Sequence, residues 1–150
     1  YTLADNGFYK LGGTADPDKT ATAAMFHDTS EIITGDMPTP VKYNNSDIIS
    51  AYKQIEKNAE ERLLNMLPED FREDFKEIYS PDAETKRLVK AADKISALIK
   101  CTEELNMGNR EFAVAEKAQR EAIQKLGCPE ADIFMEEFMP SFSLSLDEQN

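Results

Sequence analysis

The chain has 150 residues, of which 41% are apolar, and this is enough for one compact domain with a buried core. Its formal net charge of −12 disfavours polymeric nucleic acid as a partner, because phosphate backbones attract basic surfaces. No run approaches the roughly 20 apolar residues that a membrane span needs. Two cysteines without a CxxC motif indicate reduced thiols and a cytoplasmic protein.

Helix-forming residues dominate, and no pair of strands is apparent. Residues 1–8 are expected to be the last turns of a helix that begins before Tyr1. Asp16 followed by Pro17 is typical of an N-cap and the first residue of a helix. This helix is predicted to end at Gly35, and the prolines within residues 36–40 then stiffen a loop.

The rest of the chain shows apolar residues at helical spacing. Further helices are predicted over residues 46–67, 69–78, 80–108, 109–126 and 131–139, followed by an extended tail from residue 140. The inner face of the third of these helices is expected to carry Leu88, Ala92, Ile95 and Ile99. The cluster of Phe134, Met135, Phe138, Met139 and Phe142 favours core or dimer packing over a ligand site. The sequence predicts one all-α domain over residues 1–150.

The only histidine of the chain, His27, is followed directly by Asp28 on the predicted 17–35 helix. At about 100° per residue, Asp28 falls in the middle of an apolar arc, and His27 and Glu31, four residues apart, continue that arc on one side. That arc consists of Ala21, Ala24, Met25 and Ile32. An ionised carboxylate on a buried face needs a compensating cation, commonly a metal ion. The pattern therefore indicates a metal-dependent site, with Glu31 as a proton carrier.

Each of these residues also has an ordinary structural interpretation. A lone histidine is more often a surface or hydrogen-bonded side chain, and Glu31 fits a solvated helix position about equally well. Asp36 is compatible with simple turn chemistry. Asp93, at the rim of its helix's apolar arc, is compatible with an ion pair to Lys90 or Lys94.

Taken in order, the motifs resemble the HD-domain phosphohydrolase superfamily and, within it, the bacterial 5′-deoxynucleotidase family. The resemblance spans nearly the whole chain from about Ala21. It is carried by residues 27–31 (HDTSE), 34–43 (TGDMPTPVKY), 92–93 (AD), 98–101 (LIKC), 103–105 (EEL) and the tail from residue 140.

The resemblance implies a compact HD-domain helical bundle in which four side chains of an H…HD…D pattern bind one divalent ion. It implies that His27, Asp28 and Asp93 are three of these ligands and that Glu31 and Asp36 are catalytic. The nucleotide-binding residues that it implies are Asp28, Asp36, Met37, Pro38, Thr39 and Asp93. It further implies cobalt, manganese or a similar first-row ion as cofactor, deoxyribonucleoside 5′-monophosphates as substrates, and a homodimer.

The chain departs from the family pattern at its N-terminus. The first histidine of the pattern has no match before His27, and the Arg-Trp pair that contacts the nucleotide is missing, since the chain has no tryptophan. We therefore expect the domain to be N-terminally incomplete, with an inactive homologue as the alternative. Two other functions stay open: an HD hydrolase of triphosphates or ppGpp-like nucleotides, and a non-catalytic helical binding or dimerisation module.

Overall fold

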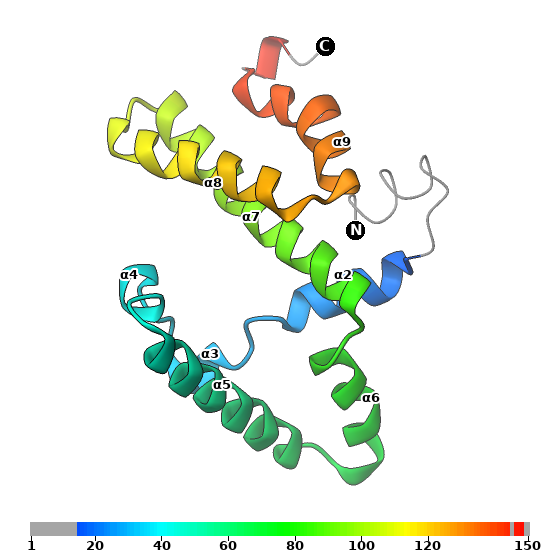
Figure 1. The fold of residues 1–150 in the computed structure, drawn as a ribbon. Helices are drawn as coiled ribbons and strands as arrows, with labels where there is room; N and C mark the ends of the chain where they lie inside the picture. Colours follow the sequence, from blue (N-terminus) through cyan, green and yellow to red (C-terminus); the bar gives the residue numbers. More distant parts are fainter. Residues whose placement is uncertain (1–14, 145, 149–150) are drawn as a thin grey trace. The chain divides into compact units, whose positions relative to one another are not determined.

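The computed structural model describes residues 15–144 and 146–148, and within them it contains helices and no strand, which confirms the all-α prediction (Figure 1). The helices are α2 Pro17–Phe26, α3 Glu31–Thr34, α4 Thr39–Lys42, α5 Ser46–Met66, α6 Glu69–Tyr79, α7 Ala83–Asn106, α8 Ala113–Leu126 and α9 Pro129–Glu137. Short 3₁₀ helices are η2 Arg110–Phe112, η3 Met139–Ser143 and η4 Leu146–Glu148. The predicted helix over residues 1–8 lies outside the described residues. None of the described helices has both the length and the apolar character to cross a membrane.

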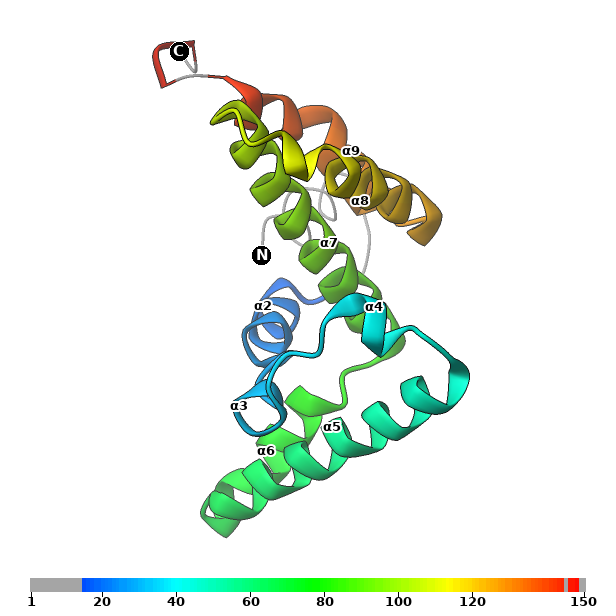
Figure 2. The ribbon, with the colours of Figure 1, turned by 90° about the vertical axis from the view of Figure 1, so that its left-hand side faces the viewer.

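The chain divides into two compact units, Met25–Pro81 on the one hand and Tyr1–Ala24 with Asp82–Asn150 on the other. In the second of these, α8 lies along α7, and α9 packs beside them (Figures 1 and 2). Leu88 and Ile95 are buried as predicted, whereas Ala92 and Ile99 are only partly buried at the edge. The core consists of Leu88, Ala91, Ile95, Leu98, Ile123, Cys128, Ala131 and Met139. The formation of one HD domain by residues 1–150 stays a prediction.

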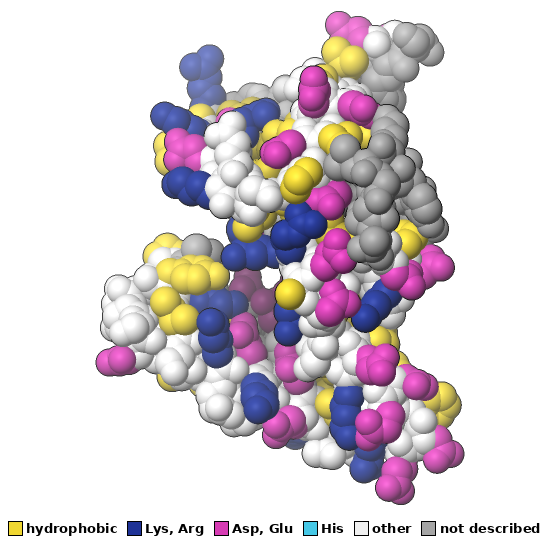
Figure 3. Space-filling model, turned by 45° about the vertical axis from the view of Figure 1, so that its right-hand side comes forward, with side chains coloured by type: hydrophobic (Ala, Val, Ile, Leu, Met, Phe, Trp, Pro, Cys, Tyr) yellow, Lys and Arg dark blue, Asp and Glu magenta, His cyan; other side chains and the backbone are white. Residues whose placement is uncertain are grey.

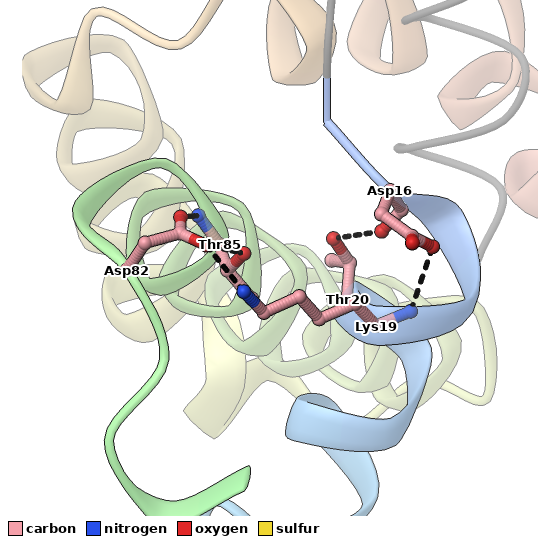
Figure 4. A network of polar contacts seen from close by, with 5 residues as sticks. All are labelled: Asp16, Lys19, Thr20, Asp82 and Thr85. Atoms are coloured by element: carbon pink, nitrogen blue, oxygen red, sulfur yellow. Dashed lines mark hydrogen bonds and ion pairs between the residues drawn. The ribbon is translucent and has the colours of Figure 1, made fainter. Parts of the chain in front are cut away.

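Helix α7 begins at Ala83, three residues later than its predicted start at residue 80. Its N-cap is Asp82, whose carboxylate accepts hydrogen bonds from the Thr85 backbone N–H at 2.8 Å and from the Thr85 hydroxyl at 3.1 Å. Lys19 of α2 donates to the same carboxylate at 2.9 Å (Figure 4). The Thr85 backbone bond, followed by the Lys19 side chain, lowers the pKa of Asp82. Asp16 caps α2 as predicted, since its carboxylate accepts from the Lys19 N–H at 3.0 Å.

The C-terminal segment is helical where an extended tail is expected. Gly127 ends α8 in the left-handed conformation (φ 55°), as the sequence predicts, and Pro129 opens α9. Residues 139–143 then form η3, because Met139 is buried in the core and Phe142 packs against it. Phe134 stacks on Phe138 and Phe142, with ring centroids 5.3 and 6.4 Å apart, which confirms packing as the role of this cluster.

A buried ion pair joins α7 to α9. Both Arg87 guanidinium Nη atoms donate to the Glu130 carboxylate, at 2.9 and 3.1 Å, and the Cys128 thiol donates to it at 3.2 Å. Glu130 is only 6% exposed. Burial is the largest single influence and acts to raise the pKa of Glu130. The hydrogen bonds from Arg87, from the backbone and from Cys128, together with the Arg87 charge, outweigh it and hold this pKa below its usual value.

We expect Glu130→Gln to lower the free energy of unfolding by about 2–3 kcal/mol, because it leaves the Arg87 charge without its buried partner. Urea denaturation measures this loss. The control Lys100→Gln removes only the exposed Lys100–Glu104 pair and should leave the midpoint unchanged.

Because the pKa of Glu130 is lower in the folded state, the stabilisation from the Arg87–Glu130 pair is complete above about pH 4.3. It is lost as the pH falls through the folded-state pKa of Glu130. An equal midpoint for Glu130→Gln and wild type at pH 7 would contradict this account.

The other unit contains α3 to α6, with α3, α4 and α6 each packed against α5 (Figure 2). The N-cap of α5 is Asn45, one residue before the predicted start, and its side-chain oxygen accepts from the Ile48 N–H at 2.9 Å. Tyr52 and Ala59 are the buried residues of α5. Pro68 separates α5 from α6 as predicted.

Candidate metal and nucleotide site

The single helix predicted over residues 17–35 is interrupted, and this prediction is wrong. Helix α2 ends at Phe26 and residues 27–30 form a turn before α3. The cause is Thr29, whose backbone N–H and side-chain hydroxyl both donate to the Phe26 carbonyl, at 3.2 and 2.8 Å. A threonine hydroxyl that bonds this carbonyl competes with the next turn of the helix.

The interruption changes the environment of Asp28. The sequence predicts that it lies on a buried face, but its side chain is 59% exposed. Met25 and Ile32, expected beside it in an apolar arc, are each 77% exposed. Because a turn does not follow the 100° periodicity of a helix, the predicted arc does not form. Asp28 is therefore accessible to solvent and to ligands.

The side chains of His27 and Asp28 nevertheless lie side by side, at the distance of a hydrogen-bonded ion pair. The His27 Nε2 atom lies 3.0 Å from the Asp28 Oδ2 atom. Two ligands that share one ion, each at about 2.1 Å and about 90° apart, are also roughly 3 Å from each other. An imidazole and a carboxylate together suit several first-row divalent ions. This pair fits two positions of a metal site, although no group of three or more His, Cys, Asp or Glu side chains within residues 15–144 and 146–148 is arranged to hold an ion.

The turn is held by aromatic residues of α6. The Phe26 ring packs edge-on against Phe75, with centroids 5.3 Å apart, and against Tyr79 at 6.5 Å. The Thr29 and Tyr79 hydroxyl oxygens lie 3.1 Å apart, within hydrogen-bond distance. Phe26 and Thr29, on the two sides of the His27–Asp28 pair, are thus both in contact with α6.

Glu31, the first residue of α3, lies in an acidic environment. It is partly buried, and burial is the largest cause that raises its pKa. The Asp28 and Asp36 carboxylates raise this pKa further, while the Lys42 ammonium acts in the opposite direction. Two of the predicted site residues, Asp28 and Asp36, therefore act electrostatically on a third, Glu31. A carboxyl group whose pKa is raised is better suited to exchange protons near neutral pH.

The loop that follows α3 carries the remaining predicted nucleotide contacts. Gly35 ends α3 with φ 69°, a value that favours glycine. Asp36 and Pro38 are exposed and Met37 is half-buried, and the backbone from Thr39 forms the single turn α4. The Pro38 carbonyl accepts from the N–H groups of Val41 and Lys42, at 2.8 and 3.0 Å.

Sequence reasoning missed three residues that hold this loop on α5. The Tyr52 hydroxyl donates to the Gly35 carbonyl at 3.0 Å, and Lys42 donates to Glu56 at 2.8 Å. The only signal in the sequence was the four-residue spacing of Tyr52 and Glu56, which places them on one helix face.

A separate pocket of about 240 Å³ lies between α3 and α5 and contains none of the predicted site residues. It is lined by Ile33, Thr34, Ile55, Asn58, Ala59 and Arg62.

Asp93 lies on α7 with its side chain 47% exposed, and its carboxylate is 3.5 Å from the Lys94 ammonium. The ion pair with Lys94, which the sequence allows as the alternative to a metal-binding role for Asp93, is thus present. Asp93 belongs to a different compact unit from His27 and Asp28. Its convergence with them on one ion stays a prediction.

Comparison with known proteins identifies the class. The model of the YfbR-like 5′-deoxynucleotidase family matches residues 2–142, so this chain belongs to that family of hydrolases. Among its relatives, a 5′-deoxynucleotidase of Vibrio parahaemolyticus is 51% identical over 142 residues, covering 93% of this chain and 73% of the relative. The 5′-deoxynucleotidase YfbR of Escherichia coli is 47% identical, covering 93% and 71%. A 5′-deoxynucleotidase of Vibrio cholerae is 47% identical, covering 93% and 73%.

Proposed function

We propose that this protein removes the 5′-phosphate from deoxyribonucleoside 5′-monophosphates with the help of one divalent metal ion. The observation that carries the proposal is the match to 5′-deoxynucleotidases over residues 2–142, which includes the turn and the loop of the candidate site. The pairing of the His27 imidazole with the Asp28 carboxylate, which are donor types that first-row divalent ions accept, supports the metal requirement. So does the charge of −12, because an acidic protein that binds a phosphate dianion needs a cation to offset repulsion. On the face drawn in Figure 3, acidic side chains are scattered among lysines and arginines.

His27, Asp28 and Asp93 would hold the ion, which we expect to be cobalt, manganese or a similar first-row ion. When bound, such an ion neutralises charge on the phosphoryl group and acidifies water. The protein's own groups then move the protons. Glu31 accepts a proton from the water that attacks phosphorus, and Asp36 gives one to the 5′-oxygen as the phosphorus–oxygen bond breaks. The products are inorganic phosphate and a deoxynucleoside.

The segment after α3 is expected to contact the substrate. We propose that Asp36, Met37, Pro38 and Thr39 line the nucleotide site, together with the carboxylates of Asp28 and Asp93. The fixed backbone around Pro38 supports this role, because a preordered loop loses less entropy when a ligand binds. The homodimer and the cytoplasmic location remain predictions from the resemblance.

Phosphate release by the purified chain tests the proposal. With cobalt or manganese added, we expect release of phosphate from dAMP and dUMP, little reaction with dGTP or ppGpp, and loss of activity on chelation. Faster hydrolysis of dGTP or ppGpp would favour an HD hydrolase of another nucleotide. The absence of both turnover and bound metal would favour the non-catalytic module.

A further inference from the structure

Both ends of the loop after α3 are anchored on one turn of α5. At one end, the Gly35 carbonyl accepts a hydrogen bond from the Tyr52 hydroxyl at 3.0 Å. At the other, the Lys42 ammonium donates to the Glu56 carboxylate at 2.8 Å. Tyr52 and Glu56 are four residues apart, so they lie on the same face of α5. Residues 36–41 are thus bracketed by two contacts with a single helix.

The two anchors also contact each other. The Lys42 ammonium lies 4.7 Å from the centroid of the Tyr52 ring, in the range of a cation–π interaction. Tyr52 is 3% exposed, and the Lys42 and Glu56 side chains are 27% and 24% exposed. Polar contacts that are partly shielded from water are stronger than those on an open surface. Burial is the largest single influence and acts to lower the pKa of Lys42. The hydrogen bond and charge of Glu56, together with Tyr43 and Tyr52, outweigh it and raise this pKa, so the lysine stays charged at neutral pH.

We propose that Tyr52, Lys42 and Glu56 form a clamp that positions residues 36–39 for the nucleotide. The inference rests on the proposed function, which places the nucleotide at those residues. The three members are positioning residues, because the Tyr52 hydroxyl bonds the loop backbone and the Lys42 and Glu56 charges bond each other. Their contribution is to keep the loop in one conformation before the ligand arrives.

Tyr52→Phe is the sharpest test, because it removes one hydroxyl and leaves the ring under Lys42. We expect KM for dAMP to rise about tenfold, as for the loss of one hydrogen bond that orders the site, with kcat within about twofold of wild type. Lys42→Met removes the other anchor and should raise KM similarly. The matched control is Tyr43→Phe, which removes the same atom from a side chain that is 63% exposed and should leave KM unchanged.

The rate of backbone amide hydrogen exchange measures the order of the loop independently of enzymatic activity. The backbone N–H groups of Val41 and Lys42 both bond to the Pro38 carbonyl and report on the order of the loop. In Tyr52→Phe and Lys42→Met they should exchange at least about threefold faster than in wild type, with exchange in α7 and Tm unchanged. If the wild-type protein were inactive but the loop exchanged faster in the variants, the proposed function would be wrong. The clamp would still be supported as a structural anchor of the loop. If Tyr52→Phe had the same KM and the same loop exchange rates as wild type, the clamp would be disproved. A variant with a lower kcat and an unchanged KM would also disprove it.

Discussion

Glu31→Gln is expected to lower kcat for dAMP by about 100-fold or more, with KM and metal content close to wild type. The amide keeps the size of the side chain but cannot accept the proton of the attacking water. Glu31 suits this role because burial and then the Asp28 and Asp36 carboxylates raise its pKa. Steady-state kinetics at saturating metal would measure the effect.

The control for this variant is Glu77→Gln, which neutralises an exposed glutamate of α6 in the same compact unit. Its kinetics should match those of wild type, which would rule out a general effect of one removed charge. If Glu31→Gln turned over dAMP at the wild-type rate with metal bound, the proton-transfer role of Glu31 would be wrong.

Asp28→Ala is expected to weaken cobalt binding by at least about 100-fold and to abolish turnover, because His27 loses its neighbouring ligand. Equilibrium dialysis measures the affinity. The exposure of the Asp28 side chain, 59%, predicts that the fold survives the change, so Tm without metal should stay near the wild-type value. The interpretation of Asp28 as a buried carboxylate would instead predict a large change in stability.

Asp74→Ala provides a matched control, since it removes an exposed aspartate from α6. It should bind cobalt as wild type does. Wild-type cobalt affinity in Asp28→Ala would exclude Asp28 from the metal site. A fall in Tm in the absence of metal would show that the carboxylate has a structural role as well.

The helices were predictable because their apolar spacing and stop signals are local. Pro68 ends α5, Gly127 ends α8, and Asp16 caps α2, as the sequence predicts. The errors arose where a side chain competes with the backbone for a hydrogen bond. The Thr29 hydroxyl bonds the Phe26 carbonyl and ends α2, and the Asp82 cap places the start of α7 at Ala83 instead of residue 80.

The site was only partly predictable for a related reason. The motifs predict Glu31 and Asp36 as site residues, and in the structure the Asp28 and Asp36 carboxylates both raise the pKa of Glu31. Helical periodicity gave the wrong exposure for Asp28, since one local break redirects the side chains that follow it. The hydrogen bond of Tyr52 to Gly35 joins residues 17 positions apart, and no local pattern indicates such a contact.

We propose that His27, Asp28 and Asp93, from two separate segments of the chain, bind one divalent ion. A crystal of the protein grown with cobalt, measured at the cobalt absorption edge, tests this claim most directly. We predict one strong anomalous peak within about 2.3 Å of His27 Nε2 and of carboxylate oxygens of Asp28 and Asp93. A cobalt peak coordinated by other residues, or no peak beside His27 at saturating cobalt, would contradict it.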